Sequence, residues 1–180
     1  MCIRDRMKVL AIFTCYNRRE LTRQSMELLG QNKNVTFDYV IVNDGSTDGT
    51  DEMLAAMPYE IDLINGDGGL FWNRGMYEAI EHAKKVHPDY EYYMLMNDDT
   101  KFVPGIFDEM LPLFAPDKVM VGAMCGDDGR MSYGGIKYVK GIKYKKYGPE
   151  AQDICFDTFN ANCAVIPLSL IHISEPTRPY

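Results

Sequence analysis

Hydrophobic residues are grouped into short continuous runs, and segments in which they recur at helical spacing lie between the runs. Five of the runs have the length of buried strands: residues 8–14, 39–43, 61–64, 92–96 and 119–124. The helical spacing is clear from about residue 72 to residue 86, where the recurring positions are Met76, Ile80, Ala83 and Val86. Continuous apolar strands that alternate with helices are typical of a mostly parallel sheet with flanking helices, which is an α/β fold.

Polar and turn-forming residues next to these runs predict where the helices begin and end. Asn17, which has Glu20 three residues later, predicts a capped helix that ends at Gly30. The buried side of this helix is expected to consist of Leu21, Met26, Leu28 and Leu29. The turn residues 44–48 lead into a second helix, and Pro104 suits the first turn of a later one.

The pattern changes after Cys125. Residues 126–148 alternate apolar and polar positions around glycines, which predicts a C-terminal β-hairpin, and residues 159–167 (FNANCAVIP) predict one further strand. The two ends, MCIRDR at residues 1–6 and SLIHISEPTRPY at residues 169–180, resemble translated sequencing-adapter sequence. We therefore expect both ends to be non-native and residues 7–168 to form one incomplete domain.

Composition narrows the classes of partner. The chain has 180 residues and a formal net charge of −7, which argues against a nucleic-acid partner because phosphate binding needs clustered Lys and Arg. No apolar stretch reaches the roughly 18 residues needed to cross a bilayer, and the start of the chain lacks the apolar core of a signal peptide. The five cysteines are scattered without a C-x-x-C pair, so we expect reduced, mostly buried thiols in a cytoplasmic protein.

Polar residues cluster where the predicted strands end. Four segments supply them: residues 14–18, Asn43-Asp44, the GDGG loop at 66–69, and Asn97-Asp98-Asp99. The carboxyl ends of parallel strands share one edge of the sheet, which is where open α/β sheets bind ligands. Asp98 and Asp99 are adjacent like charges, which are costly unless a cation or donors neutralise them. Beside phosphate oxygens, such a pair suits Mg²⁺ or Mn²⁺.

Other functions and simpler structural roles compete with this interpretation. Asp98 and Asp99 can turn the chain and cap a helix near Pro104. Asp44 can form a turn and also accept a hydrogen bond from a nucleobase N–H or a ribose hydroxyl. NAD binding needs G-x-G-x-x-G after the first strand, where this chain has TCYNRR. A flavodoxin-like phosphoacceptor domain needs an acid pair at the same point and is disfavoured by the same segment.

Six segments taken together resemble a family 2 glycosyltransferase of the GT-A fold, most closely its rhamnosyltransferase-like branch. In chain order they are VLAIFTCYNRRELTRQSMELL, YVIVNDGSTDGT, NGDGGLFWNRGMYEAI, YYMLMNDDT, SYGG and FNANCAVIP, within residues 7–168. The resemblance implies inverting transfer of a hexose from dTDP-rhamnose or a UDP-sugar to a glycan or lipid-linked acceptor, assisted by Mg²⁺ or Mn²⁺. It further implies a bacterial enzyme of cell-wall or polysaccharide biosynthesis.

The resemblance also implies roles for individual residues. Asp99 is the expected metal ligand, and the expected nucleotide-sugar-binding residues are Thr14, Tyr16, Asn17, Arg18, Asp44, Gly68, Gly69, Trp72, Arg74, Asn97 and Asp98. Asn97 replaces the family's usual third acid, and an amide can coordinate or donate but brings no charge. Arg74 stands where related members often have glycine. Trp72 suits stacking on a sugar face and anchoring of a helix start equally well.

The catalytic residue itself is not identified by the sequence. In the family, the general base comes from an acidic motif well after the FNANCAVIP strand, which lies beyond the end of this chain. We therefore expect weak turnover or none, and a non-catalytic nucleotide-binding fragment is the alternative function.

A run of basic residues in the predicted hairpin bears on localisation. The run comprises Lys137, Lys140, Lys143, Lys145 and Lys146, interleaved with tyrosines. It suits a solvated hairpin face or peripheral contact with anionic lipid at the inner face of the plasma membrane. His82 and His87 are assigned no chemistry, and the sequence does not indicate an oligomeric state.

Overall fold

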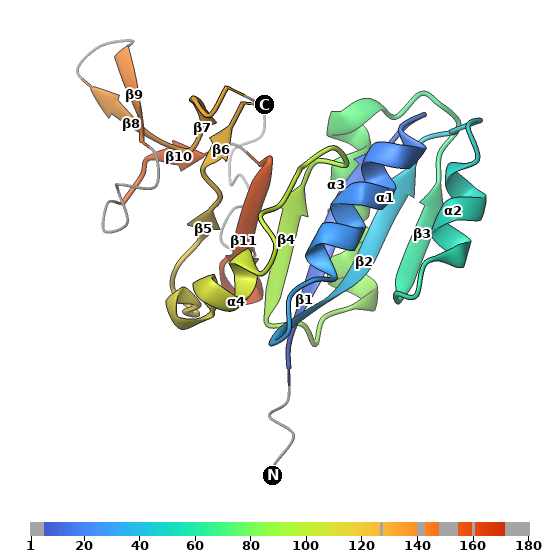
Figure 1. The fold of residues 1–180 in the computed structure, drawn as a ribbon, viewed down its shortest axis with the longest axis horizontal. Coiled ribbons are helices and arrows are strands. Elements are labelled where there is room, and N and C mark those ends of the chain that lie inside the picture. The colour runs from blue at the N-terminus through green and yellow to red at the C-terminus, as the bar shows by residue number, and fades with distance from the viewer. Residues whose placement is uncertain (1–5, 127, 140–142, 148–154, 160, 172–180) are drawn as a thin grey trace.

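The computed structural model describes residues 6–126, 128–139, 143–147, 155–159 and 161–171 (Figure 1). The strands of the main sheet are β1 (Met7–Cys15), β2 (Val35–Asn43), β3 (Ile61–Asn65), β4 (Tyr92–Met96), β5 (Met120–Val121) and β11 (Cys163–Pro167). The helices are α1 (Arg19–Leu29), α2 (Thr50–Ala56), α3 (Phe71–Val86), α4 (Ile106–Met110) and α5 (Leu168–Ile171), with a 3₁₀ turn, η1, at Leu111–Leu113.

The main sheet has six strands in the order β3-β2-β1-β4-β11-β5. β3, β2, β1 and β4 run parallel to one another, whereas β11 is antiparallel to both of its neighbours, β4 and β5. Helices lie on both faces of this sheet (Figure 1). The predicted α/β fold with a mostly parallel sheet and flanking helices is therefore confirmed.

Successive side chains of β1 point to opposite faces of the sheet, so the hydrophobic core is divided between the two faces. Val9, Ala11 and Phe13 join a cluster that includes residues of α1, α2 and α4, while Leu10 and Ile12 join a second cluster beneath α3. β1 is buried along residues 9–15 because it has a paired strand on each side and helices above and below it. A strand of this kind needs apolar residues at consecutive positions, as the KVLAIFT run has.

Three local predictions were wrong. Leu21 is 41% exposed, so it does not belong to the buried side of α1. Asn17 does not cap α1 through its side chain; the backbone N–H of Arg19 at the start of that helix instead donates to the carboxylate of Asp48. The run 119–124 is not one strand, because β5 ends at Val121 and β6 (Met124–Cys125) belongs to another sheet.

The predicted C-terminal hairpin is present as β8 (Gly135–Val139) paired antiparallel with β9 (Lys143–Tyr147). β10 (Thr158–Phe159) pairs with β8, and β7 (Met131–Tyr133) pairs with β6. Lys140 lies outside the described residues, and the side chains of residues 143–147 are not described, so the predicted basic face stays a prediction.

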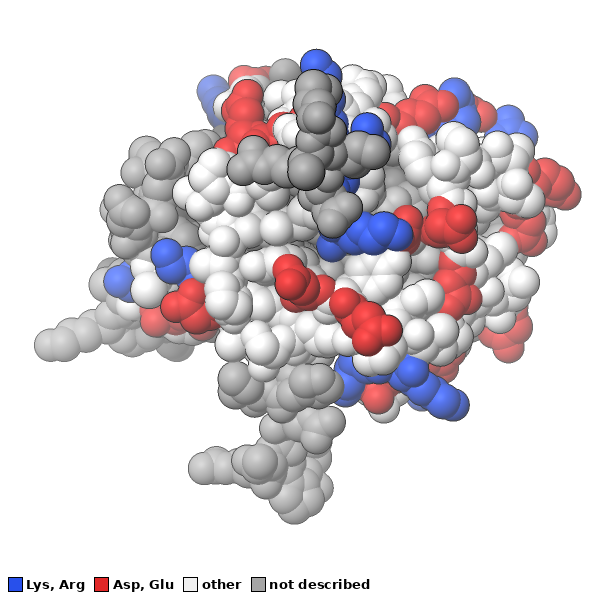
Figure 2. Space-filling model, turned by 90° about the horizontal axis from the view of Figure 1, so that it is seen from below, with Lys and Arg blue, Asp and Glu red and all other residues white. Residues whose placement is uncertain are grey.

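Surface charge, helix hydrophobicity and the burial of cysteines can be compared with the predictions made from composition. On the face drawn in Figure 2, acidic side chains are spread over the surface, and the basic ones stand singly or in small groups between them. None of the helices in the described part of the chain is both long and apolar enough to cross a membrane. Cys15 and Cys163 are buried free thiols, as predicted, but Cys125 and Cys155 are exposed.

Candidate functional site

Residues after β1 and residues after β2 are joined by hydrogen bonds at the carboxyl edge of the sheet. The backbone N–H of Asn17 donates to Ser46 Oγ at 2.9 Å, and Asn17 Oδ1 accepts the backbone N–H of Thr47 at 2.7 Å. Asn17 has a φ of 50°, a left-handed conformation that asparagine tolerates better than most residues. The predicted nucleotide-binding segment around Asn17 is therefore held against the loop that follows β2.

Arg18 links the same segment to the acid pair after β4. Its Nη1 lies 2.8 Å from Asp99 Oδ2 and 3.2 Å from Asp98 Oδ1. One guanidinium thus bridges both carboxylates, whose charges would otherwise repel each other. The structure therefore brings Arg18 into contact with Asp98 and Asp99, which lie some eighty positions later in the chain. The sequence predicted all three as site residues.

The two aspartates of this pair differ in environment. The side chain of Asp98 is 8% exposed, whereas that of Asp99 is 42% exposed. Burial raises the pKa of Asp98 to about 6, which the charge of Arg18 opposes and the charge of Asp99 reinforces. Asp99 is therefore the carboxylate that is accessible to a ligand, and Asp98 lies beneath it.

Asp44 is buried and braces the glycine-rich loop. Its two carboxylate oxygens accept the backbone N–H groups of Gly68 at 2.9 Å, Leu70 at 3.1 and 3.2 Å, and Phe71 at 2.9 Å. These donors include the N–H groups at the start of α3, which have no partner within the helix. Asp44 therefore fixes where the loop 66–70 and the first turn of α3 lie relative to β2.

The backbone of this loop is strained at one non-glycine residue. Phe71 has a φ of 54° and is 76% exposed, and Gly68 has a φ of 89°. Glycine adopts such angles freely, but phenylalanine does so at a cost of about 1–2 kcal/mol. The Asp44 carboxylate, which holds the N–H of Phe71, offsets part of this cost.

Trp72 and Asn97 are also in direct contact. The indole Nε1–H of Trp72 donates to Asn97 Oδ1 at 3.2 Å, and Asn97 Nδ2 donates to Asn162 Oδ1 at 3.1 Å. The contact joins the start of α3 to the end of β4 and to the residue just before β11. Trp72 remains 48% exposed.

The remaining predicted residues lie apart from these contacts. The side chain of Thr14 is buried against α3, and a Cβ added at Gly75 would lie 2.8 Å from its Oγ1. Arg74 Nε pairs with Glu78 on its own helix at 2.8 Å. Tyr16 is 55% exposed, and Gly69 donates its N–H to Asp67 within the loop.

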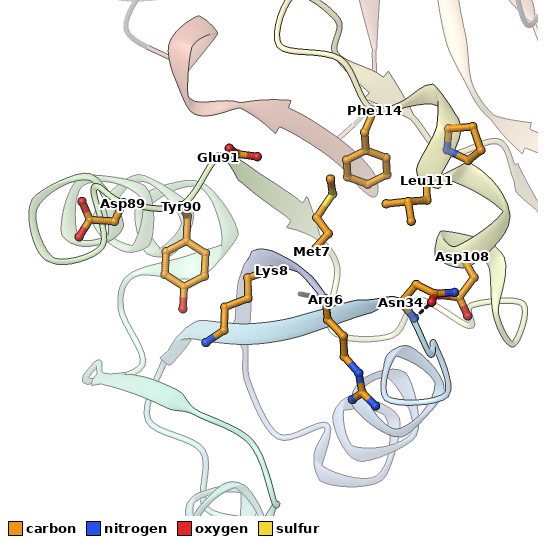
Figure 3. Close-up of a pocket in the computed structure, with 11 residues that line it drawn as sticks. Arg6, Met7, Lys8, Asn34, Asp89, Tyr90, Glu91, Asp108, Leu111 and Phe114 are labelled. Atoms are coloured by element: carbon orange, nitrogen blue, oxygen red, sulfur yellow. Dashed lines mark hydrogen bonds between the residues drawn. The ribbon is translucent and has the colours of Figure 1, made fainter. Parts of the chain in front are cut away.

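Two cavities lie near opposite ends of the sheet. A cavity of about 300 Å³ is lined by Asn17, Arg18, Arg19, Glu20, Leu21 and Asp48, beside the predicted site. A larger one, of about 1040 Å³, lies at the amino ends of β1 and β4 (Figure 3). Met7, Leu111 and Phe114 stand on one side of it, and Lys8 and Tyr90 on another.

Two of the charged side chains that line the larger cavity, Lys8 and Asp108, are engaged in contacts of the fold. Lys8 pairs with Asp38 at 3.3 Å, and Asp108 accepts the backbone N–H groups of Lys33 and Asn34, each at 2.7 Å. Size alone would favour this cavity as a ligand site. The partly exposed carboxylate of Asp99, the amides and the exposed indole lie at the other edge of the sheet, and we place the candidate site there.

Several residues of the site could not be identified from sequence. Ser46 sits within a turn motif, but nothing in the sequence marks its hydroxyl as the acceptor of the Asn17 N–H. Asn162 lies in the FNANCAVIP segment, and its contact with Asn97 spans 65 residues. The positive φ of Phe71 leaves no sequence signal at all, because glycine would be the expected residue there.

Comparisons with known proteins agree with this architecture. The family model described as Glycosyl transferase family 2 matches residues 11–164. No curated protein matches the chain.

Three solved structures are similar. S. aureus TarS 1-349 in complex with UDP gives a TM-score of 0.64 at 16% identity, covering 93% of this chain and 48% of that one. The mannosyltransferase PcManGT from Pyrobaculum calidifontis, in complex with GDP-Man and Mn²⁺, gives 0.62 at 15%, covering 94% and 47%. The galactosyltransferase LgtC, in complex with donor and acceptor sugar analogs, gives 0.53 at 11%, covering 94% and 60%. These likenesses establish the GT-A arrangement, and the chain spans about half the length of the first two proteins.

Proposed function

The chain belongs to glycosyl transferase family 2, and on this premise we propose that it binds a nucleoside-diphosphate sugar for transfer to an acceptor hydroxyl. The donor is dTDP-rhamnose or a UDP-sugar, and the acceptor is a glycan or a lipid-linked glycan. Two of the similar structures support a nucleotide-sugar donor, since one contains UDP and the other GDP-Man. The reaction takes place in the cytoplasm, with a lipid-linked acceptor presented at the inner face of the plasma membrane.

One observation carries this proposal: Arg18 bridges Asp98 and Asp99 at the edge where the loops after β1 and β2 meet. A diphosphate bound there meets a guanidinium, which can hold phosphate oxygens in two parallel hydrogen bonds. It also meets the exposed carboxylate of Asp99, which would be a ligand for a divalent cation bound with the nucleotide. The base and ribose then extend toward the Asn17–Ser46 contact.

The residues present fit a divalent cation only in part. Asp99 offers a half-exposed oxygen ligand of the kind that Mg²⁺ and Mn²⁺ prefer. Within the residues that the structure describes, no group of three or more His, Cys, Asp or Glu side chains assembles to hold a metal. The phosphate oxygens of the donor would therefore have to complete the coordination, so we expect metal and nucleotide to bind together.

The chemistry follows from a single inverting displacement. The acceptor oxygen forms a bond to the anomeric carbon as the bond from that carbon to the diphosphate oxygen breaks, and the hydroxyl proton passes to a general base. Asp99 would hold the divalent cation, which would supply positive charge to the leaving diphosphate. Arg18 supplies positive charge to the same group, and Asp44 keeps the adjoining loop in place. We assign no general base among the described residues.

Calorimetry with nucleotides tests the proposal. UDP and dTDP are titrated into the wild-type chain and into Asp99→Asn, with and without MnCl₂. We expect binding of at least one of the two nucleotides to depend on Mn²⁺, and Asp99→Asn to weaken it by about tenfold or more, because a lone carboxylate ligand to the ion is lost.

The matched control is Asp117→Asn, which removes an equal charge from an exposed position away from this edge. It should bind nucleotide as the wild type does. Metal-independent binding that is unchanged in Asp99→Asn would remove the proposed role of Asp99, and failure of both nucleotides to bind would overturn the proposed function.

A further inference from the structure

Three side chains from separate parts of the fold form one chain of hydrogen bonds beside the acid pair. Trp72 at the start of α3 donates to Asn97 after β4, and Asn97 donates to Asn162 before β11. The backbone reinforces the link between the last two, since the N–H of Asn97 and the hydroxyl of Thr100 both donate to the carbonyl oxygen of Asn162. β4 and β11 are thereby tied together where they carry the candidate site.

The direction of these bonds is fixed by the chemistry of the groups. An indole nitrogen can only donate, so the atom of Asn97 that faces it must be the carbonyl Oδ1. The Nδ2 of Asn97 is then turned toward Asn162 Oδ1, which accepts from it at 3.1 Å. Both ends of the amide are engaged, and a carboxylate at position 97 could accept from Trp72 but could not donate to Asn162. The amide of Asn97 therefore serves to connect Trp72 with Asn162, which a third metal-binding acid at this position could not do.

Trp72 is held at one edge of its ring and remains about half exposed. Its backbone follows Phe71, whose N–H is held by Asp44, and its Nε1–H is held by Asn97, yet the residue is 48% exposed. An indole with its polar edge bound has lost much of its rotational freedom before any ligand arrives, which lowers the entropy cost of stacking. Aromatic faces of this kind are suited to the apolar C–H face of a sugar ring.

The order of strands indicates which part of the donor would reach this ring. The Asn17–Ser46 contact lies at the ends of β1 and β2, whereas Asn97 and Asn162 lie at β4 and β11, farther along the sheet. Arg18 and the acid pair connect the two regions. A nucleotide sugar whose base lies near β2 and whose diphosphate lies at Asp99 therefore extends its sugar toward Trp72.

We infer that Asn97 and Asn162 are positioning residues that hold Trp72 as a stacking surface for the pyranose ring of the donor. This inference rests on the proposed function, because it assumes that the nucleoside diphosphate binds beside Asp99. On this inference, the contact between α3, β4 and β11 contributes to the binding of the sugar and not to the binding of the nucleotide.

The test separates the contribution of the sugar to binding affinity from that of the nucleotide. With MnCl₂ present, affinities for UDP, UDP-glucose, dTDP and dTDP-rhamnose are measured by calorimetry in wild type and Asn97→Ala. We expect Asn97→Ala to weaken binding of the nucleotide sugar by about fivefold, as for the loss of an ordered aromatic contact, and to leave that of the parent diphosphate within about twofold. Trp72→Phe keeps an aromatic face but lacks the N–H donor. It should lose a similar share of the extra affinity that the nucleotide sugar has over the parent diphosphate.

Trp72 also provides a direct reading of its own position, since the chain contains one tryptophan. In Asn97→Ala, the fluorescence anisotropy of Trp72 should fall because its anchored edge is released. In the wild type, the nucleotide sugar should change the emission more than the diphosphate does. Tyr77→Leu, which removes a 60% exposed aromatic ring from the same helix, is the matched control and should change neither affinity nor Trp72 emission.

The possible outcomes separate the positioning role of Asn97, the assignment of Trp72 to the donor, and the proposed function. If the diphosphates bind but Asn97→Ala and Trp72→Phe bind the nucleotide sugars as tightly as wild type, the positioning role is wrong while the proposed function stands. If methyl glucoside alone changes Trp72 emission as the nucleotide sugar does, the ring stacks on an acceptor and the assignment to the donor is wrong. If no nucleotide binds to the wild type, both the function and this inference fail.

Discussion

The Asp44 carboxylate serves the fold at the same place where a nucleotide is proposed to bind. It is 4% exposed, and both of its oxygens accept backbone N–H groups of the loop that leads into α3. Two glycines permit this close packing, because a Cβ at Gly45 would lie 2.9 Å from the backbone nitrogen of Gly68, and one at Gly66 would lie 2.5 Å from Asp44 Oδ1. A ligand that reached Asp44 would have to share these oxygens with the backbone.

Asp44→Asn tests how strongly this brace matters. The amide would present an N–H₂ group to backbone donors on one side, so we expect the free energy of unfolding to fall by about 1–3 kcal/mol, the cost of leaving a buried donor unmatched. Urea denaturation followed by circular dichroism measures it. Asp67→Asn in the same loop is the control, because its carboxylate is exposed and accepts one bond that an amide can also accept. Equal stability of the two variants would show that Asp44 is not a structural brace.

The sequence predicted the types of residue at the site better than their partners. Asp44, Asp98 and Asp99 follow apolar runs directly, so their location at the carboxyl edge follows from the parallel topology. The acceptance of N–H groups by Asp44 from residues 24 to 27 positions later has no local signal. Tertiary packing decides such contacts, and Asp44, which the sequence predicted as a nucleotide contact, holds the backbone of the loop 66–70.

At the scale of elements, continuous apolar runs predicted β1, β3 and β4 to within one residue at each end, but they missed the first four residues of β2 and the end of the sheet at β5. β4 spans Tyr92–Met96 as predicted, because it is paired on both sides and covered on both faces. The run 119–124 does not continue as one strand past Val121; Gly122 packs on Cys163 of β11, and its N–H donates to the carbonyl oxygen of Cys163. The sequence does not reveal that β11 returns antiparallel between β4 and β5, which leaves β5 only two residues to pair.

β3 is one of the two edge strands of the main sheet, and the carboxylate of Asp62 links it to the C-terminal end of α3. Asp62 Oδ2 lies 2.7 Å from His82 Nε2 and 3.1 Å from His87 Nε2. Partial burial raises the pKa of Asp62, but the hydrogen bonds from the two histidines outweigh it, and the net pKa lies below the ordinary value of 3.8. His82 and His87, for which the sequence predicted no chemistry, therefore have a structural role.

The sign of this shift gives a pH-dependent prediction. Because the pKa of Asp62 is lower in the folded than in the unfolded chain, its contribution to stability is present above pH 3.8 and is lost as the pH falls through its folded value. We expect Asp62→Asn to lower the free energy of unfolding by about 0.5–1 kcal/mol at pH 7, and the difference from wild type to shrink below about pH 4. Thermal unfolding between pH 3 and pH 7 measures it, with Asp89→Asn as control. A difference that grows toward low pH would contradict the assigned direction.

At the scale of the whole molecule, the two ends of the sheet offer different ligand environments. The amino end has the larger cavity, but Lys8 and Asp108 there are engaged by Asp38 and by backbone N–H groups. The carboxyl end has the smaller cavity, which Arg18 lines, and the same edge of the sheet carries the exposed carboxylate of Asp99 and the indole of Trp72. Volume and chemistry thus favour opposite ends, and the parallel topology agrees with the chemistry because open α/β sheets bind ligands at the carboxyl ends of their strands.

Hydrogen exchange can decide between the two ends. We expect UDP or dTDP with MnCl₂ to slow amide exchange together in the four segments 15–18, 44–49, 66–72 and 97–100, because one ligand would order loops that come from four places in the chain. The segments that line the larger cavity, 33–35 and 89–91, should exchange at unchanged rates. Asp99→Asn should abolish the Mn²⁺-dependent part of the slowing in all four segments, whereas Asp117→Asn should retain it. Slowing confined to 33–35 and 89–91 would place the nucleotide at the amino end, and the roles proposed for Arg18, Asp99 and Trp72 would then be wrong.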